Sequence, residues 1–237
     1  MDNVIDALRK LNRFLIDSGV AGLPYVDLLM APRARDKKIY PYMPQDELNA
    51  VFEHINRDTA VGKRDFAILM LAASTGLRSG DIANIKLKDI NWLQNEICLI
   101  QGKSQKPILL PLYKSVGTAI ADYILSGRPS SDSPQIFLRS IAPFQKFKDG
   151  VSVACVLRRR MKEAGIMHEK EDGKTMHGIR RMLGTCMTVK GVPVTTVAQI
   201  LGHKNISVTR QYISLDIEGL CECALGFDSI SEVKPGC

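Results

Sequence analysis

The sequence predicts a mixed α/β protein that is predominantly α-helical and carries one small antiparallel sheet. Apolar residues recur at helical spacing in several segments, most clearly at 48–55 and 65–74. Three short β-rich segments follow one another in the middle of the chain, at 85–90, 96–100 and 107–112. With 237 residues, of which 45% are hydrophobic, the chain is long enough to bury a sizeable core.

The N-terminal part predicts one helix followed by a basic linker. Apolar residues recur at helical spacing from Val4 to Leu15, and Gly19 ends the helix. Residues 21–44 hold several prolines and a charged cluster, which is typical of an extended segment. Two interpretations stay open, a solvated loop and a strap across a phosphate backbone. The basic side chains of such a strap would be Arg33, Arg35, Lys37 and Lys38.

Beyond the linker the sequence predicts a compact helical region. The helix at 48–55 is amphipathic, whereas the one at 65–74 is apolar nearly all round and is expected at the centre of the core. Gly76 ends this central helix, and Ser79 can cap a further short helix over 79–85.

The last two predicted strands are joined by the turn 102–106, so they form a hairpin that carries lysines. Helical patterns return after this hairpin and continue to the C-terminal part of the chain. The helices predicted there cover 113–125, 151–164, 178–190, 193–201 and 215–225.

The charge of the chain favours a polyanionic partner. It has 32 Lys and Arg against 25 Asp and Glu, a net charge of +7. Such a charge favours nucleic acid, although many basic proteins bind none. The triplet Arg158, Arg159 and Arg160 lies in the predicted helix 151–164. A charge run is usually only a solvated face, but on a basic domain an arginine triplet favours phosphate contact.

Composition argues against several other classes of protein. The six cysteines are scattered, and the close pair Cys221 and Cys223 lacks the further ligands that a zinc site requires. No carboxylate cluster indicates a Mg²⁺ site, so we expect neither a metal nor a cofactor. Because no apolar run is long enough to span a membrane and residues 1–10 are not a secretory signal, we expect a cytoplasmic protein without a membrane partner.

Several polar residues have a spacing that indicates a shared site. His177 and Arg180 lie three positions apart, so on a helix they share one face. Further on, His203 follows Gly202, which can end a helix, and Tyr212 ends the next short segment. Each residue alone is more simply explained as a capping or buried side chain.

Taken in order, these motifs resemble the tyrosine recombinase (phage integrase) family over residues 8–216. The matching motifs are Thr75–Asp81, Gly102-Lys103, His177-Gly178-Ile179-Arg180, Leu201-Gly202-His203 and Tyr212. The resemblance implies a tyrosine recombinase catalytic-domain fold and a site-specific DNA recombinase, or integrase, that acts through a 3′-phosphotyrosine intermediate. It implies that the catalytic residues are Arg78, Lys103, His177, Arg180, His203 and Tyr212. It also implies that Asp81 supports the first arginine.

The chemistry of these side chains agrees with that function. When a phenol attacks a phosphodiester, negative charge builds up on the non-bridging oxygens, which Arg78 and Arg180 can bind bidentately. His203 can donate to the same oxygens. The Tyr212 phenol is weakly nucleophilic because its unperturbed pKa is about 10, and His177 can serve as its base or orienting partner.

The leaving 5′ oxygen needs a proton. Lys103, at the tip of the predicted hairpin, is the expected general acid, and Lys106 in the same turn is a rival. Several cationic donors together could supply the electrostatic stabilisation that metals give in other phosphoryl-transfer sites.

The resemblance also implies an organisation of the chain. Residues 1–20 would be the last helix of a truncated core-binding domain, 21–44 the linker and 45–214 the catalytic domain. Residues 215–237 would be a tail with two open interpretations, since its apolar residues can pack against their own domain or, as the resemblance implies, dock on a neighbouring protomer. The implied partners are double-stranded DNA and, on paired DNA sites, a homotetramer of chains that are monomers when free. A nucleoid-associated protein would follow.

The chain departs from the family pattern near His177, since Gly178 stands where an acidic residue is common and Met182 where a small polar one is usual. Two alternatives to a site-specific recombinase stay open. A type IB topoisomerase would relax DNA with a similar set of residues, and a catalytically silent regulator would keep the fold and bind DNA only.

Overall fold

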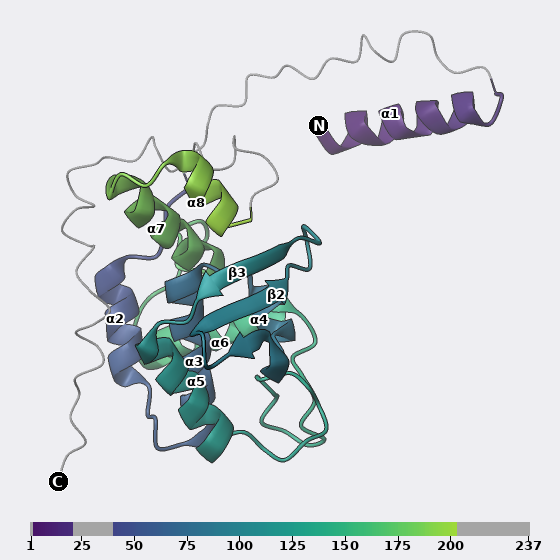
Figure 1. The fold of residues 1–237 in the computed structure, drawn as a ribbon. Coiled ribbons are helices and arrows are strands. Elements are labelled where there is room, and N and C mark those ends of the chain that lie inside the picture. Colours follow the sequence, from purple (N-terminus) through teal and green to yellow (C-terminus); the bar gives the residue numbers. More distant parts are fainter. Residues whose placement is uncertain (1, 21–39, 203–237) are drawn as a thin grey trace. The chain divides into compact units, whose positions relative to one another are not determined.

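The structure is a computed structural model that describes residues 2–20 and 40–202 (Figure 1). The chain divides into two compact units, residues 1–38 and 39–237. In the first unit, helix α1 spans Asp2–Asp17, where the sequence predicts a helix. Its apolar side chains Leu8, Leu11 and Phe14 are exposed. The basic residues of the predicted linker, Arg33, Arg35, Lys37 and Lys38, lie outside the described residues.

The second unit has the fold class that the sequence predicts, mostly helices with one small antiparallel sheet. Its described elements, in chain order, are α2 (Gln45–His54), α3 (Ala60–Thr75), α4 (Ser79–Asn84), the 3₁₀ helix η2 (Leu87–Asp89), β1 (Ile90–Asn91), β2 (Glu96–Ile100), β3 (Pro107–Pro111), α5 (Lys114–Ser126), α6 (Gly150–Glu163), α7 (Met176–Val189) and α8 (Val194–Ile200). Met43, which precedes α2, is fully buried, so the packed unit begins before residue 45.

Helix α3 lies at the centre of the core, as predicted, and contacts α4, α5, α6 and α7. It begins earlier than the predicted residue 65 because the Thr59 hydroxyl accepts a hydrogen bond from the Gly62 N–H at 3.0 Å, which caps the helix. It ends at Gly76, whose φ of 61° is left-handed. A residue with a Cβ would be strained at this φ, so the turn needs glycine for its conformation, and the space beside it is filled by the Leu201 Cδ2, 2.8 Å from where a Cβ would lie.

The three strands form an antiparallel sheet in the order β1-β2-β3. In β2, Ile97 and Leu99 are buried and alternate with the exposed Cys98 and Ile100. One face of the sheet therefore packs on the helices and the other faces solvent. In Figure 1 the sheet lies against the helical core, and the hairpin between β2 and β3 extends beyond it.

The prediction of a strand at 85–90 is wrong for most of that segment. Only Ile90 pairs in the sheet from this segment, opposite Ile97, and Leu87–Asp89 form the 3₁₀ helix η2. The Asp89 carboxylate accepts a hydrogen bond from the Lys86 N–H at 2.9 Å. Such a local side-chain bond gives the backbone an alternative to a strand ladder.

Helix α7 shows why the chain departs from the family pattern at Gly178. The Thr175 hydroxyl caps the helix by accepting from the Gly178 N–H at 3.0 Å. A Cβ at Gly178 would lie only 1.7 Å from the carbonyl oxygen of Gly173, so no larger residue fits. Met182, the second departure, is buried in the core at 2% exposure.

The predicted helix at 215–225 lies outside the described residues. Within the described part of the chain, none of the helices is both long and apolar enough to cross a bilayer.

Candidate active site

Arg78 is placed by the tight connection between α3 and α4. It is the N-cap residue directly before α4, two positions after the left-handed Gly76. Its Nη1 donates to the Gln101 side-chain Oε1 at 3.2 Å, and its Nη2 donates to the Gly202 carbonyl oxygen at 2.9 Å. Both acceptors are neutral, so these bonds fix the guanidinium without compensating its charge.

Lys103 lies in the turn between β2 and β3. It is exposed and makes no hydrogen bond or ion pair with the described residues. Asp81, on α4, holds this turn, because its Oδ1 accepts from the Gly102 N–H at 2.8 Å. The family resemblance implies that Asp81 supports the first arginine, whereas the hydrogen bond in the structure supports the turn of the lysine.

His177 and Arg180 lie in the first turns of α7, where the cap at Thr175 begins the helix. Arg180 is 2% exposed, and its Nη1 donates to the carbonyl oxygen of Gly76 at 2.6 Å. Its Nη2 donates to the carbonyl oxygen of Leu201. Arg180 therefore ties the end of α3 to the end of α8, and both of these ends border the position of Arg78.

His177 lies within the electrostatic field of the other predicted catalytic cations. The residue keeps an exposed surface, yet desolvation by the surrounding protein atoms is the main cause that lowers its pKa from 6.5 to about 4. The further causes are the positive charges of Arg181, Arg180, Arg78 and Lys103. The structure thus gathers four of the six predicted catalytic residues, and it leaves His177 neutral at pH 7.

His203 and Tyr212, the remaining two predicted residues, lie outside the described residues. Gly202, which precedes His203 in the sequence, belongs to the described site, since its carbonyl oxygen accepts from the Arg78 Nη2. Gly202 has a φ of 61°, and a Cβ there would lie 2.0 Å from the Gln101 Oε1. Only glycine allows this close approach.

Gln101 is a site residue that sequence reasoning missed. It is 1% exposed, and its Oε1 accepts from both Arg78 and the Ser104 hydroxyl, the latter at 2.7 Å. In the sequence it is a polar residue at the end of a strand, and polar residues are ordinary at the start of a turn. The one available signal was its place directly before Gly102 and Lys103.

The three arginines of the triplet on α6 differ in their contacts. Arg158 is exposed. Arg159 and Arg160 both bond the carboxylate of the fully buried Asp65, with 2.6 Å from the Arg160 Nη2 to Oδ2. Burial alone would lower the pKa of the Arg160 guanidinium, but the carboxylates of Asp65 and Glu163 together raise it. A contact between this triplet and DNA stays a prediction, and the geometry gives Arg160 a structural role.

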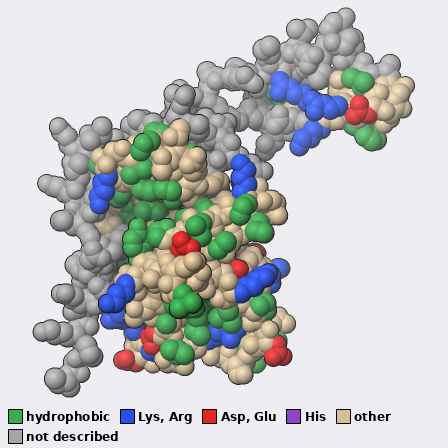
Figure 2. Space-filling view, in the orientation of Figure 1, with side chains coloured by type: hydrophobic (Ala, Val, Ile, Leu, Met, Phe, Trp, Pro, Cys, Tyr) green, Lys and Arg blue, Asp and Glu red, His purple; other side chains and the backbone are tan. Residues whose placement is uncertain are grey.

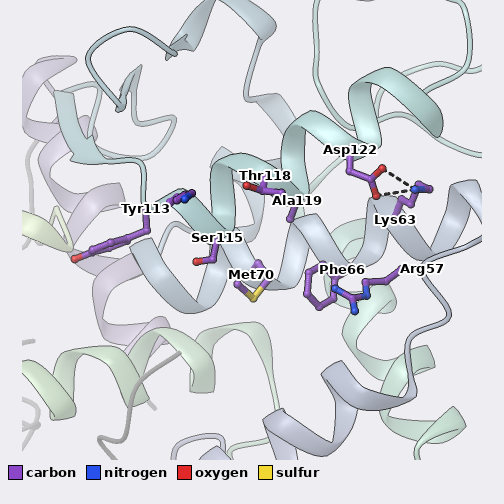
Figure 3. Close-up of a pocket in the computed structure, with 10 residues that line it drawn as sticks. Arg57, Lys63, Phe66, Met70, Tyr113, Ser115, Thr118, Ala119 and Asp122 are labelled. Carbon is purple, nitrogen blue, oxygen red and sulfur yellow. Dashed lines mark hydrogen bonds and ion pairs between the residues drawn. The ribbon is translucent and has the colours of Figure 1, made fainter. Parts of the chain in front are cut away.

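A pocket of about 620 Å³ lies between α3 and α5, away from these residues (Figure 3). Phe66 and Met70 line it together with the ion pair of Lys63 and Asp122, whose Nζ and Oδ1 are 2.6 Å apart. Among the described residues, none of Arg78, Lys103, His177 and Arg180 lines this pocket. On the face of the second unit shown in Figure 2, the described Lys and Arg side chains are scattered among hydrophobic ones.

The model of the phage integrase family matches residues 41–218, most of the chain. The putative integrase/recombinase y4gC of Sinorhizobium fredii is 38% identical over 184 residues, which are 77% of this chain and 93% of that protein. The putative integrase/recombinase y4rF of the same organism is 33% identical over 187 residues, which are 79% of this chain and 44% of that protein. The chain therefore belongs to the phage integrase family, although it spans less than half the length of y4rF.

Solved structures show the same fold. The crystal structure of XerA recombinase superposes with a TM-score of 0.64 at 22% identity, over 92% of this chain and 73% of that one. A lambda integrase tetramer bound to a Holliday junction superposes with a TM-score of 0.62 at 20% identity, over 92% of this chain and 58% of that one. The second unit thus has the catalytic-domain fold of the tyrosine recombinases, as the resemblance in the sequence implies.

Proposed function

We propose that the chain is the catalytic part of a site-specific DNA recombinase that cleaves and rejoins DNA through a 3′-phosphotyrosine bond to Tyr212. The observation that carries the proposal is the convergence of Arg78, Lys103 and Arg180 on His177, which lies in the positive field of all three. Within the described residues, no carboxylate pairs with Arg78 or Lys103. Their positive charges therefore favour an anionic substrate such as a phosphodiester.

The site residues divide the chemistry between them. Arg78 and Arg180 stabilise the charge that develops on the non-bridging phosphate oxygens, and His203 donates to the same oxygens. The Tyr212 oxygen attacks phosphorus, a Tyr–phosphate bond forms, and the bond from phosphorus to the 5′ oxygen breaks. Because the new bond conserves the phosphodiester, the reverse attack by a 5′ hydroxyl rejoins the strand.

Two protons move in this reaction. His177 is neutral at pH 7 because its pKa is lowered to about 4, so it can accept the phenol proton or orient the phenol. A bound phosphate, being negative, would raise that pKa and make the ring a stronger base. Lys103 gives a proton to the leaving 5′ oxygen, and its place in the field around His177 favours it over Lys106.

The proposed partner is double-stranded DNA, and the protein would then act in the cytoplasm at the nucleoid. Arg158 and the linker residues Arg33, Arg35, Lys37 and Lys38 are the proposed phosphate contacts, supported by the net charge of +7. We also propose a homotetramer on paired DNA sites, assembled from monomers, because lambda integrase has been solved as a tetramer on a Holliday junction.

A covalent-adduct assay tests the proposed activity. DNA that the full chain selects from a random library would be made into substrates that carry a nick beside the scissile phosphate, so that the cleaved product is trapped. We expect a protein–DNA adduct that survives denaturing electrophoresis and maps to one position in the selected site. Selective binding without any adduct would instead indicate the silent regulator, and adducts without site preference together with plasmid relaxation would indicate the topoisomerase.

Deleting Leu220–Cys237 tests the tetramer. If the tail docks on a neighbouring protomer, the truncated chain should still cleave single sites but should not assemble paired ones. The measurement is the mobility of paired-site complexes on native gels, beside single-site adduct yield. Paired complexes and recombination at full rate without the tail would rule out this role.

A further inference from the structure

We propose that Gln101 is a positioning residue that holds the Lys103 turn in register with Arg78, so that the proton donor and the first phosphate-binding arginine are presented together. This inference rests on the proposed function. Three described contacts of Gln101 carry it: its bonds with Arg78 and Ser104, and its close approach to Gly202.

The side-chain amide of Gln101 is buried, and its orientation follows from its partners. Gln101 is 1% exposed, and its Oε1 is 3.2 Å from the Arg78 Nη1 and 2.7 Å from the Ser104 Oγ. A guanidinium can only donate, so the oxygen and not the nitrogen of the amide must face Arg78. One oxygen atom thus accepts from the anion-binding arginine and from the neighbour of Lys103.

The turn that carries Lys103 is anchored to the helices by side chains. Its backbone is closed by hydrogen bonds from the Gln101 N–H to the Lys106 carbonyl oxygen at 3.0 Å and from the Gln105 N–H to the Gln101 carbonyl oxygen at 2.8 Å. These bonds shape the turn but do not attach it to the helices. Two described side chains make that attachment, Asp81 through the Gly102 N–H and Gln101 through Arg78.

Gln101 also lies against Gly202, the residue before His203 in the sequence. The amide of Gln101 occupies the space where a Cβ of Gly202 would lie, 2.0 Å from that position to Oε1 and 2.5 Å to Nε2. The carbonyl oxygen of Gly202 accepts in turn from the Arg78 Nη2 at 2.9 Å. Gln101, Arg78 and Gly202 therefore form a closed set of contacts, and the turn of the general acid is attached to it.

Removing this acceptor should act mainly through Lys103. Arg78 keeps its bond to Gly202 and its place at the start of α4 when Gln101 is lost. Lys103 has no described bond of its own, so its position depends on the turn. A displacement of about 1 Å in a reacting group can cost up to about 100-fold in rate.

The test compares Gln101→Met with wild type on two substrates. Methionine has a similar length and fills the space without an acceptor oxygen. Cleavage of ordinary DNA should slow by about 10- to 100-fold. A substrate with a 5′-bridging sulfur, whose thiolate leaves without a proton donor, should bring the variant to within about 3-fold of wild type. Gln199→Met, an exposed glutamine of α8, is the matched control and should match wild type on both.

Two results would overturn the proposal: unchanged cleavage of ordinary DNA by folded Gln101→Met, or a loss that the sulfur substrate does not reduce. If Gln101→Met fails to fold, Ser104→Ala decides, because it removes only one bond at a part-exposed site and should give a smaller loss with the same rescue.

Hydrogen exchange separates this inference from the proposed function. Amides of 102–106 should exchange faster in Gln101→Met than in wild type, while those in the middle of α3 stay unchanged. If wild type forms no adduct with either substrate, the proposed function fails, and the exchange rates still decide whether Gln101 holds the turn. Equal exchange in the two proteins would contradict it.

Discussion

Two arginine sites in the second unit, a cluster around Asp65 and the single residue Arg78, differ in the acceptors that hold them. Around the buried Asp65, which we call the Asp65 cluster, Arg64, Arg159 and Arg160 all donate to one carboxylate. Arg78 instead donates to a side-chain amide oxygen and to a backbone carbonyl oxygen. A carboxylate compensates a guanidinium, whereas a neutral oxygen fixes its position and leaves its charge for another anion.

This difference separates a structural role from a catalytic one. The Asp65 cluster joins α3 to α6 and exposes none of its carboxylate. Arg78 lies beside the turn of Lys103 and acts on the pKa of His177. Arginine content therefore says little about DNA contact, and the identity of the acceptor says more.

The largest expected effect is on stability, from Asp65→Ala. This change removes the buried carboxylate that Arg64 and Arg160 share as an acceptor and should lower the free energy of unfolding by about 3–5 kcal/mol. Urea unfolding followed by circular dichroism measures it. The control is Asp122→Ala, which breaks a more exposed pair with Lys63 and should cost about 0–1 kcal/mol. Equal costs for the two variants would remove the distinction between them.

Arg78→Ala should show the opposite pattern. The loss of a donor that binds developing charge should slow adduct formation by about 100- to 1000-fold. Unfolding by urea should change far less than in Asp65→Ala, because the partners of Arg78 are two neutral oxygens. Cleavage within a few fold of wild type would show that Arg78 is not part of the catalytic set.

Lys103→Ala should slow cleavage of ordinary DNA by about 100-fold or more, as expected for a lost general acid. A 5′-bridging sulfur should restore most of the rate. Lys106→Ala is the matched control, since this lysine lies in the same turn. If the sulfur rescues Lys106→Ala but not Lys103→Ala, the two assignments must be exchanged.

The smallest expected effect is a change in a titration. In the free protein, NMR should show the His177 ring titrating with a pKa of about 4. Arg181→Ala should raise this pKa, although not to 6.5, because burial is the larger cause. Arg158→Ala, an exposed arginine on α6, should leave the pKa unchanged. A wild-type pKa near 6.5 would contradict the electrostatic convergence at this site.

The lowered pKa of His177 also makes the stability of the fold depend on pH. Above pH 6.5 the His177 ring is neutral in both the folded and the unfolded chain. Between 6.5 and about 4 the unfolded chain binds a proton that the folded chain does not. The free energy of unfolding should therefore fall as the pH falls through this window, and His177→Asn should reduce that fall.

The central helix and the order of the motifs could be predicted from the sequence, because both depend on local patterns. The apolar run at 65–74 indicates a buried helix, and Gly76 indicates its end. The strand at 85–90 could not be predicted correctly, since the side chain of Asp89 competes for the Lys86 N–H. A propensity pattern does not contain that bond.

The contacts that distinguish the two arginine sites could not be predicted. Asp65 meets Arg160 across 95 positions of the chain, and Arg78 meets Gly202 across 124. Spacing in the sequence says nothing about such pairs. Gln101 was missed for the same reason, because its role appears only when the turn, α4 and the end of α8 are brought together.

The most direct test of the catalytic assignment is to map the residue that becomes linked to DNA. The adduct formed on selected DNA would be digested with nuclease and protease, and the nucleotide-bearing peptide would be identified by mass spectrometry. The proposed mechanism predicts a 3′-phosphate ester on Tyr212, and no adduct from Tyr212→Phe although DNA affinity stays within a few fold. A nucleotide on another residue, or an adduct that persists in Tyr212→Phe, would contradict it.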